Sequence, residues 1–236
     1  MKISVYIWDW PLRLFHWLLV LAVVGSFATG KLGGNLTDWH ARLGGLVLGL
    51  LVFRLLWGFI GTTHARFVNF FPTFSRLALY FKGEWQGVGH NPGGALAIIA
   101  LLATLAFLVA TGLFANDDIG FEGPLFHLID KDFSDKLSGW HASLVNILLG
   151  LVAIHVTAIF VYQKVKKTNL VAPMLTGKID VPKSLAPNSI RAVSPLRFIF
   201  SLLISATVVW GVWGGGFAKY LAPLASFQTV SAHDKT

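Results

Sequence analysis

Four histidines lie inside long apolar stretches of the sequence, where an imidazole is costly to bury and is therefore usually functional. They are His16, His40, His141 and His155. Imidazole nitrogen is a common metal ligand. The chain has no cysteine, which excludes thiolate ligands, iron–sulfur clusters and any cofactor attached through a Cys-x-x-Cys-His motif. A metal or cofactor would have to be held by histidine, carboxylate or backbone groups.

His141 and His155 are spaced so that one helix presents both rings. Fourteen residues correspond to a rise of about 21 Å along a helix and return the side chain to within roughly 40° of the same face. The two imidazoles therefore share a face, one near each membrane surface. The other two apolar histidines match them in depth, His40 at the outer level and His16 at the inner level.

These depths predict two bis-histidine pairs, His16 with His155 and His40 with His141. Facing helices that offer two imidazoles at one depth can hold a b-type haem between them, with the histidines as axial ligands of the iron. A zinc site would need three or four ligands at one depth, and only two are available at each. The alternative is that these are helix-end histidines that face headgroups or bond to carbonyls.

The elements that must position the histidines are membrane-spanning helices. Of the 236 residues, 55% are hydrophobic and 13% are charged, against about 25% charged in soluble domains, and the mean hydropathy is +0.66. A bilayer is crossed by about 20 apolar residues. Five such spans are predicted, at Leu12–Gly30, Trp39–Ile60, Ala95–Phe114, Leu137–Tyr162 and Leu196–Gly214.

Charge in the connections predicts the orientation of the spans. The connections between the second and third spans and between the fourth and fifth are basic, whereas the third-to-fourth connection, with six acids between residues 117 and 135, is acidic. Because positive loops stay in the cytoplasm, the N-terminus should lie inside, and the acidic loop and the C-terminus outside. That loop could meet a basic partner or could simply be solvated.

Three arginines flank or enter the spans and are candidate contacts for haem propionates. They are Arg13, Arg42 and Arg54. The alternative for each is contact with lipid phosphate.

The other four histidines, His64, His90, His127 and His233, lie in connections or the tail and should be solvated, although His64 and His90 border a surface where a quinone could dock. No catalytic acid or base can be assigned.

Long motifs in residues 5–180 resemble the bacterial cytochrome b561 and nickel-hydrogenase cytochrome b family. The stretch WDWPLRLFHW resembles the family's entry to the first helix, WHARLGGLVLGLLVFRLLWGFIGTTHARF its second helix, and HNPGGALAIIALLATLAFLVATGLF its third. WHASLVNILLGLVAIH resembles the fourth helix, with two histidines on one helix, and NLVAPMLTGK resembles the segment that follows.

The resemblance implies an all-α membrane protein of the bacterial inner membrane. A four-helix transmembrane bundle, residues 1–180, would bind two haems b through the same four histidines. Residues 181–236 would form a cytoplasmic connection, a fifth transmembrane helix and a short external tail. Such proteins pass electrons in the respiratory chain between quinone and a periplasmic c-type cytochrome, hydrogenase or other reductase. A self-contained quinone oxidoreductase that oxidises superoxide, and a haem-free anchor or transporter, are the alternatives.

Overall fold

The computed structural model describes residues 2–185 and 191–214, and its long helices account for the apolar spans. Among these residues, five helices are long and apolar enough to cross a membrane. They are α1 (Trp10–Leu32), α2 (Thr37–Ile60), α5 (Pro92–Leu113), α6 (Lys131–Lys164) and α8 (Pro195–Trp213). The expected fold class, an all-α bundle of membrane helices, is confirmed, and each helix covers the span predicted for it to within a few residues at most ends.

The largest departure is at the start of α6, which begins six residues before the predicted Leu137. The side chain of Asp130 accepts a hydrogen bond from the backbone N–H of Phe133 at 2.9 Å and caps the helix there. Capping groups of this kind satisfy backbone donors that the first helical turn leaves unpaired. Asp9 and Asn91, each followed within two residues by a proline, cap α1 and α5 in the same way.

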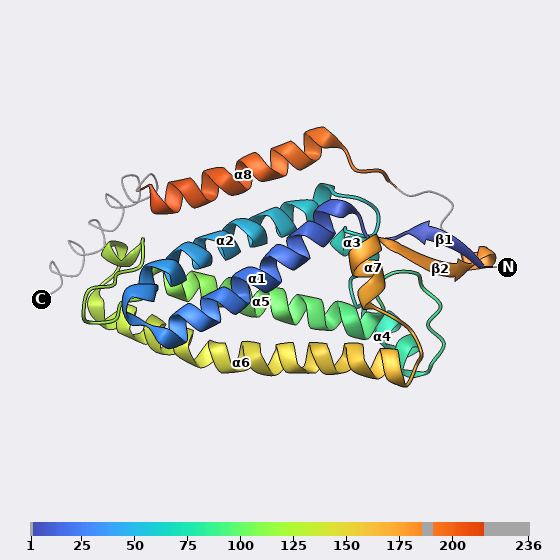
Figure 1. Ribbon diagram of the computed structural model, residues 1–236, viewed down its shortest axis with the longest axis horizontal. Coiled ribbons are helices and arrows are strands. Elements are labelled where there is room, and N and C mark those ends of the chain that lie inside the picture. The colour runs from blue at the N-terminus through green and yellow to red at the C-terminus, as the bar shows by residue number, and fades with distance from the viewer. Residues whose placement is uncertain (1, 186–190, 215–236) are drawn as a thin grey trace, which may run out of the picture.

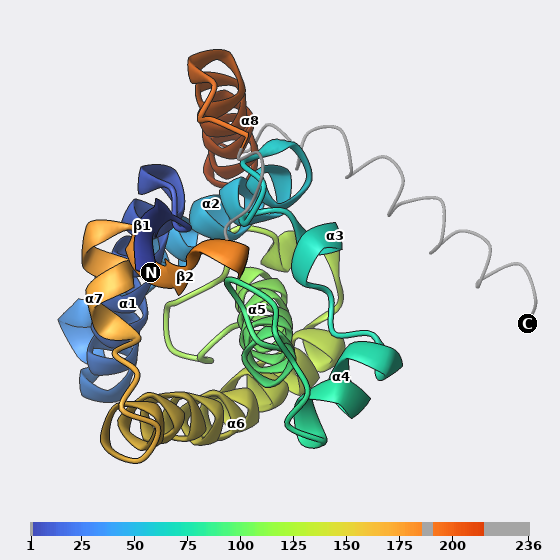
Figure 2. The ribbon, with the colours of Figure 1, turned by 90° about the vertical axis from the view of Figure 1, so that its right-hand side faces the viewer.

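The helices pack as two antiparallel pairs, with the fifth spanning helix outside them. α1 packs on α2, α5 packs on α6, and α2 also contacts α5. Figure 2 shows the four helices around a common axis, with α8 on the far side of α2. α1 and α6 face each other without close backbone packing. The four-helix core and the peripheral fifth helix are thus distinct in their packing.

Short elements close the end of the bundle that the charge pattern predicts to face the cytoplasm, which is called the inner end below. β1 (Lys2–Tyr6) pairs antiparallel with β2 (Lys178–Pro182), beside the short helix α7 (Val171–Thr176) (Figure 1). The remaining short helices at this end are α3 (Phe67–Phe70), α4 (Phe74–Phe81) and the 3-10 turn η3 (Lys183–Leu185). The 3-10 turns η1 (Gly34–Leu36) and η2 (Phe126–Leu128) lie at the opposite end, between α1 and α2 and between α5 and α6. The expected domain boundary at residue 180 falls within β2, so that strand belongs structurally with the N-terminus.

Asp9 joins the start of α1 to the inner end of α2. Besides capping α1, its carboxylate accepts hydrogen bonds from Trp57 Nε1 at 3.0 Å and from the hydroxyl of Thr62. Trp57 is fully buried. The buried guanidinium of Arg54 interacts electrostatically with the same carboxylate and donates to the carbonyl of Ala65 at 3.1 Å. A single acidic side chain therefore accepts hydrogen bonds from three donors, the backbone N–H of Leu12 among them, and lies near one buried cation.

We predict that Asp9→Ala destabilises the fold by about 2–4 kcal/mol, since it removes a helix cap and leaves buried donors without an acceptor. Equilibrium unfolding in mixed micelles, followed by circular dichroism, measures the effect. Asp38→Ala is the matched control, because this acid in the first turn of α2 makes no hydrogen bond among the described residues. The Asp38→Ala variant should lose only about 0.5 kcal/mol of stability. Equal losses in both variants would contradict the role given to Asp9.

Candidate functional site

The outer pair of histidines comes together between α2 and α6. The ring centroids of His40 and His141 lie 5.9 Å apart, with the ring planes at 85°. A metal held by two imidazole nitrogens at about 2 Å from each would set the centroids about 6 Å apart. The structure therefore brings together two imidazoles that the sequence separates by 101 positions, at a spacing that fits axial ligation.

Backbone carbonyls fix the orientation of both outer rings. His40 Nδ1 lies 2.8 Å from the carbonyl oxygen of Ser26 on α1, and His141 Nδ1 lies 2.9 Å from that of Leu108 on α5. A carbonyl can only accept a hydrogen bond, so each Nδ1 carries the proton. The lone pair is then left on Nε2, which is the arrangement of metal-binding histidines whose second nitrogen is anchored by the protein.

Two glycines permit the close approach of these rings to neighbouring helices. A Cβ atom on Gly30 would lie 2.9 Å from His40 Nδ1, and one on Gly112 would lie 3.0 Å from His141 Cε1. The sequence did not point to either glycine. Gly45 and Gly49, which follow His40 in sequence, instead face Trp213 and Val209 of α8.

The inner pair is built differently. His16 on α1 and His155 on α6 are near enough to interact electrostatically, and the ring of His16 meets the edge of Trp17 at a centroid distance of 5.0 Å. His16 Nδ1 is buried and has no hydrogen-bond partner among the described residues. The structure thus brings His40 and His141 into contact, whereas the pairing of His16 with His155 stays a prediction. Among the described residues, carbonyl anchoring of the rings is seen for His40 and His141.

The three candidate arginines have other contacts. Arg13 donates to the carbonyl of Leu175 and holds α7 against α1. Arg54 is buried, only 2% exposed, and its guanidinium lies 4.5 Å from the ring centroid of Phe67. Arg42 is exposed on α2, roughly 200° around the helix from His40. These positions favour roles in packing or lipid contact over propionate binding.

His90 and His64 lie in the connections at the inner end and pack there instead of facing solvent. The His90 ring lies between Trp8 and Phe70, at centroid distances of 4.2 and 4.5 Å. Burial lowers the pKa of His90 to about 3, helped by the nearby charges of Arg54 and His64. Burial also lowers the pKa of His64. His90 is therefore neutral at pH 7 and acts as a packed aromatic group.

His127 lies away from the His40–His141 pair. It lies in η2, in the connection between α5 and α6, and His233 lies outside the described residues.

His40 and His141 face each other in a membrane-embedded helical bundle, and Nε2 of each ring is left for a metal. This arrangement defines a class of membrane proteins that hold a haem between their helices. The model of the family described as prokaryotic cytochrome b561 matches residues 7–177. The chain belongs to the prokaryotic cytochrome b561 family and is a multi-pass membrane cytochrome b that serves in electron transport. Haem b is the cofactor that this family implies.

Similar proteins carry one recurring name, "Probable Ni/Fe-hydrogenase B-type cytochrome subunit". The one from Rhizobium leguminosarum bv. viciae is 23% identical over 214 residues, which cover 74% of this chain and 88% of the relative. The one from Azotobacter vinelandii is 25% identical over 215 residues, with the same coverage. A related subunit of Escherichia coli K12 is 24% identical over 145 residues, covering 47% and 59%. No solved structure matches.

The described residues fit the implied haem. They contain no group of three or more histidine and acidic side chains that could hold a metal ion by itself. His40 and His141 would hold the haem iron through Nε2, because Nδ1 of each ring is bonded to a backbone carbonyl, and the haem would supply one-electron chemistry there.

We predict that Gly112→Val weakens haem binding at the outer pair by about 10–100-fold, the usual effect of disturbing a group that orients a metal ligand. A side chain there would push the His141 ring from its carbonyl anchor. The reduced absorbance spectrum and haem content of the purified protein report the loss. Gly150→Val is the matched control, since a Cβ on Gly150 meets nothing within 4 Å. An unchanged spectrum for Gly112→Val would contradict the proposed anchoring.

Proposed function

We propose that this protein is a dihaem cytochrome b that carries electrons across the bacterial inner membrane between quinone and a redox partner on the outer side. The observation that carries the proposal is the facing pair of His40 and His141, with both Nδ1 atoms bonded to backbone carbonyls. His16 and His155 form the second site by the same depth argument. A haem b at each pair would supply a one-electron centre.

α6 sets the distance between the two proposed sites. His141 and His155 are on one continuous helix, so their separation along the axis is about 21 Å. α1 and α2 supply the opposite ligands, one each. The protein's contribution is thus to fix two pairs of imidazoles at different depths and to surround them with apolar side chains, which exclude water from the path.

A nickel–iron hydrogenase is the partner that we propose. The named relatives are hydrogenase cytochrome subunits, and their similarity covers 74% of this chain. A periplasmic c-type cytochrome or another reductase would dock on the same outer surface of the protein.

The proposed outer surface contains an ordered acidic loop. Asp117 accepts hydrogen bonds from the backbone N–H groups of Ile119, Gly120 and Phe121, and these bonds lower the pKa of Asp117. Lys131 pairs with Asp118 and Asp135 at 2.6 and 2.8 Å. Part of the loop's charge is therefore already balanced within the chain.

Quinone is the proposed substrate exchanged with the membrane. We assign no residue to its protonation. Asp9 is already used as a helix cap and hydrogen-bond acceptor, and His90 remains neutral at pH 7 because of its lowered pKa.

Single ligand variants test the proposed function. His141→Ala should remove the outer haem and retain the inner one, and His155→Ala should do the reverse, so each variant retains about half of the haem. Haem content and the reduced α-band of each purified variant measure this. In liposomes, both variants should lose quinol-driven reduction of an acceptor on the opposite side, because either loss interrupts the path.

His127→Ala is the control, because this histidine lies in the connection between α5 and α6 and its replacement should change neither spectrum nor transfer. The pairing by depth is wrong if the two ligand variants lose the same spectral component. Wild-type protein without any b-type absorbance would contradict the function as a whole.

The proposed orientation can be tested by single-cysteine labelling, because the chain has no native cysteine. Ile119 in the acidic loop is 93% exposed, and Glu84 between α4 and α5 is exposed on the opposite side. In intact spheroplasts, an impermeant maleimide should label Ile119→Cys and not Glu84→Cys. Both should react after the membrane is disrupted. The reverse pattern would show the opposite orientation.

A further inference from the structure

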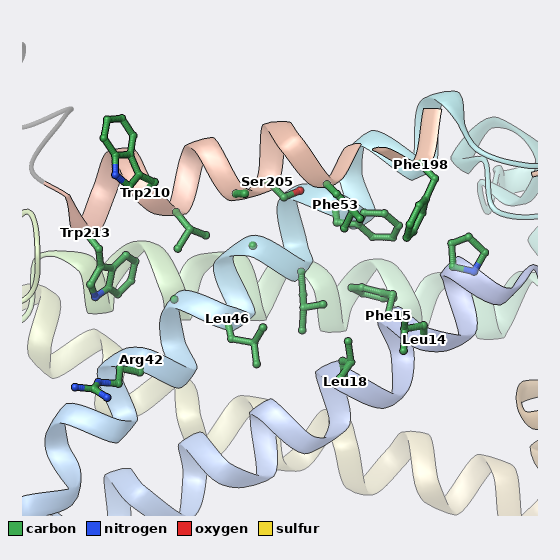
Figure 3. Close-up of a pocket in the computed structure, with 17 residues that line it drawn as sticks. Leu14, Phe15, Leu18, Arg42, Leu46, Phe53, Phe198, Ser205, Trp210 and Trp213 are labelled. Atoms are coloured by element: carbon green, nitrogen blue, oxygen red, sulfur yellow. The ribbon is translucent and has the colours of Figure 1, made fainter. Parts of the chain in front are cut away.

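An apolar groove runs along the membrane-facing side of the bundle between α1, α2 and α8. It has a volume of about 630 Å³. It exists because α8 packs mainly along α2 and diverges from α1 over most of its length (Figures 2 and 3). Its lining is almost entirely aliphatic and aromatic, with Ser205 and Arg42 as the polar exceptions.

One face of α2 forms the floor of the groove. The residues that contribute are Arg42, Gly45, Leu46, Gly49, Leu50 and Phe53, which recur at the spacing of a single helical stripe. From Arg42 to Phe53 the helix rises about 16 Å. The hydrocarbon of one bilayer leaflet is about 15 Å deep, half of the about 30 Å total. The groove floor therefore matches the depth that one acyl chain spans.

Arg42 stands at the outer end of this floor (Figure 3). Its guanidinium lies over the ring of Trp39 at 5.3 Å, and Trp39 and Trp210 are exposed at the same end. Exposed tryptophans of this kind mark the headgroup level of a membrane. Asp38, one turn before Arg42 on α2, forms no ion pair with it, and no other carboxylate among the described residues does so.

We propose that this groove binds one anionic phospholipid of the outer leaflet, with an acyl chain along α2 and the phosphate at Arg42. The charge and the shape point to the same occupant. An apolar channel one leaflet deep takes a hydrocarbon chain. A cation at headgroup depth that has no carboxylate partner among the described residues takes an anionic group. The nearly unbroken apolar lining offers few partners for the carbonyl oxygens of a quinone ring.

Native mass spectrometry of the full-length protein in mild detergent tests the proposal, with phosphatidylglycerol and phosphatidylcholine as probes. Wild-type protein should retain one phosphatidylglycerol in preference to phosphatidylcholine. Arg42→Gln should lower phosphatidylglycerol retention by about tenfold, the effect of losing one charge-assisted contact. Lys31→Gln is the matched control, because Lys31 is a cation in the last turn of α1 at the same surface but outside the groove.

A second pair of variants tests the tail site independently of charge. Ala206 lines the groove, whereas Leu203 on the same helix is exposed to lipid outside it. Ala206→Phe should reduce retention of phosphatidylglycerol by filling the groove, and Leu203→Phe should leave it unchanged. An unaltered circular dichroism melting curve confirms that each variant is folded.

Three outcomes would overturn the proposal. The first is equal retention of both lipids by the wild type, and the second is retention that does not respond to Arg42→Gln. The third is a different occupant, seen as a bound quinone or as a dimer that Ala206→Phe displaces. The result is independent of the haem proposal, since none of these measurements depends on the four histidines.

Discussion

The bond between an imidazole Nδ1 and a helix carbonyl is the interaction on which the core depends. His40 of α2 bonds to Ser26 of α1, and His141 of α6 bonds to Leu108 of α5. Each bond therefore crosses one of the two antiparallel helix pairs, and the contact between the two rings joins the pairs. In hydrocarbon no water can replace these partners. The same bonds that hold four helices in register also fix which ring nitrogen is available to a metal.

Much of this arrangement could be predicted from the sequence, because it depends on local periodicity. Spans of apolar residues indicated the five helices, and the 14-residue spacing of His141 and His155 indicated their common face. The depth argument paired His40 with His141, which the structure brings within 5.9 Å. These inferences needed only helix rise, helix twist and membrane thickness.

Other features depend on contacts between distant segments and gave no local signal. β1 and β2 are short, and they pair across more than 170 residues. Gly30 and Gly112 resemble any other small residue of an apolar helix until the rings that they accommodate are known. Asp9 could not be recognised as the acceptor for Trp57 and Thr62, since its partners lie 48 and 53 residues away. The direction of Arg42 was deducible from helical phase, because two residues turn the helix by about 200° from His40.

The length of α6 has a consequence for how the protein tolerates different membranes. With 34 residues, it is about 51 Å long, well beyond the hydrocarbon thickness of about 30 Å. A thicker or thinner bilayer would therefore change how much of each helix end lies among headgroups, or tilt the bundle, as hydrophobic mismatch requires. It would not change the spacing of His141 and His155, because both residues lie on the one continuous helix α6. The distance between the two proposed haem sites would therefore be set by the polypeptide and would not depend on the lipid composition of the membrane.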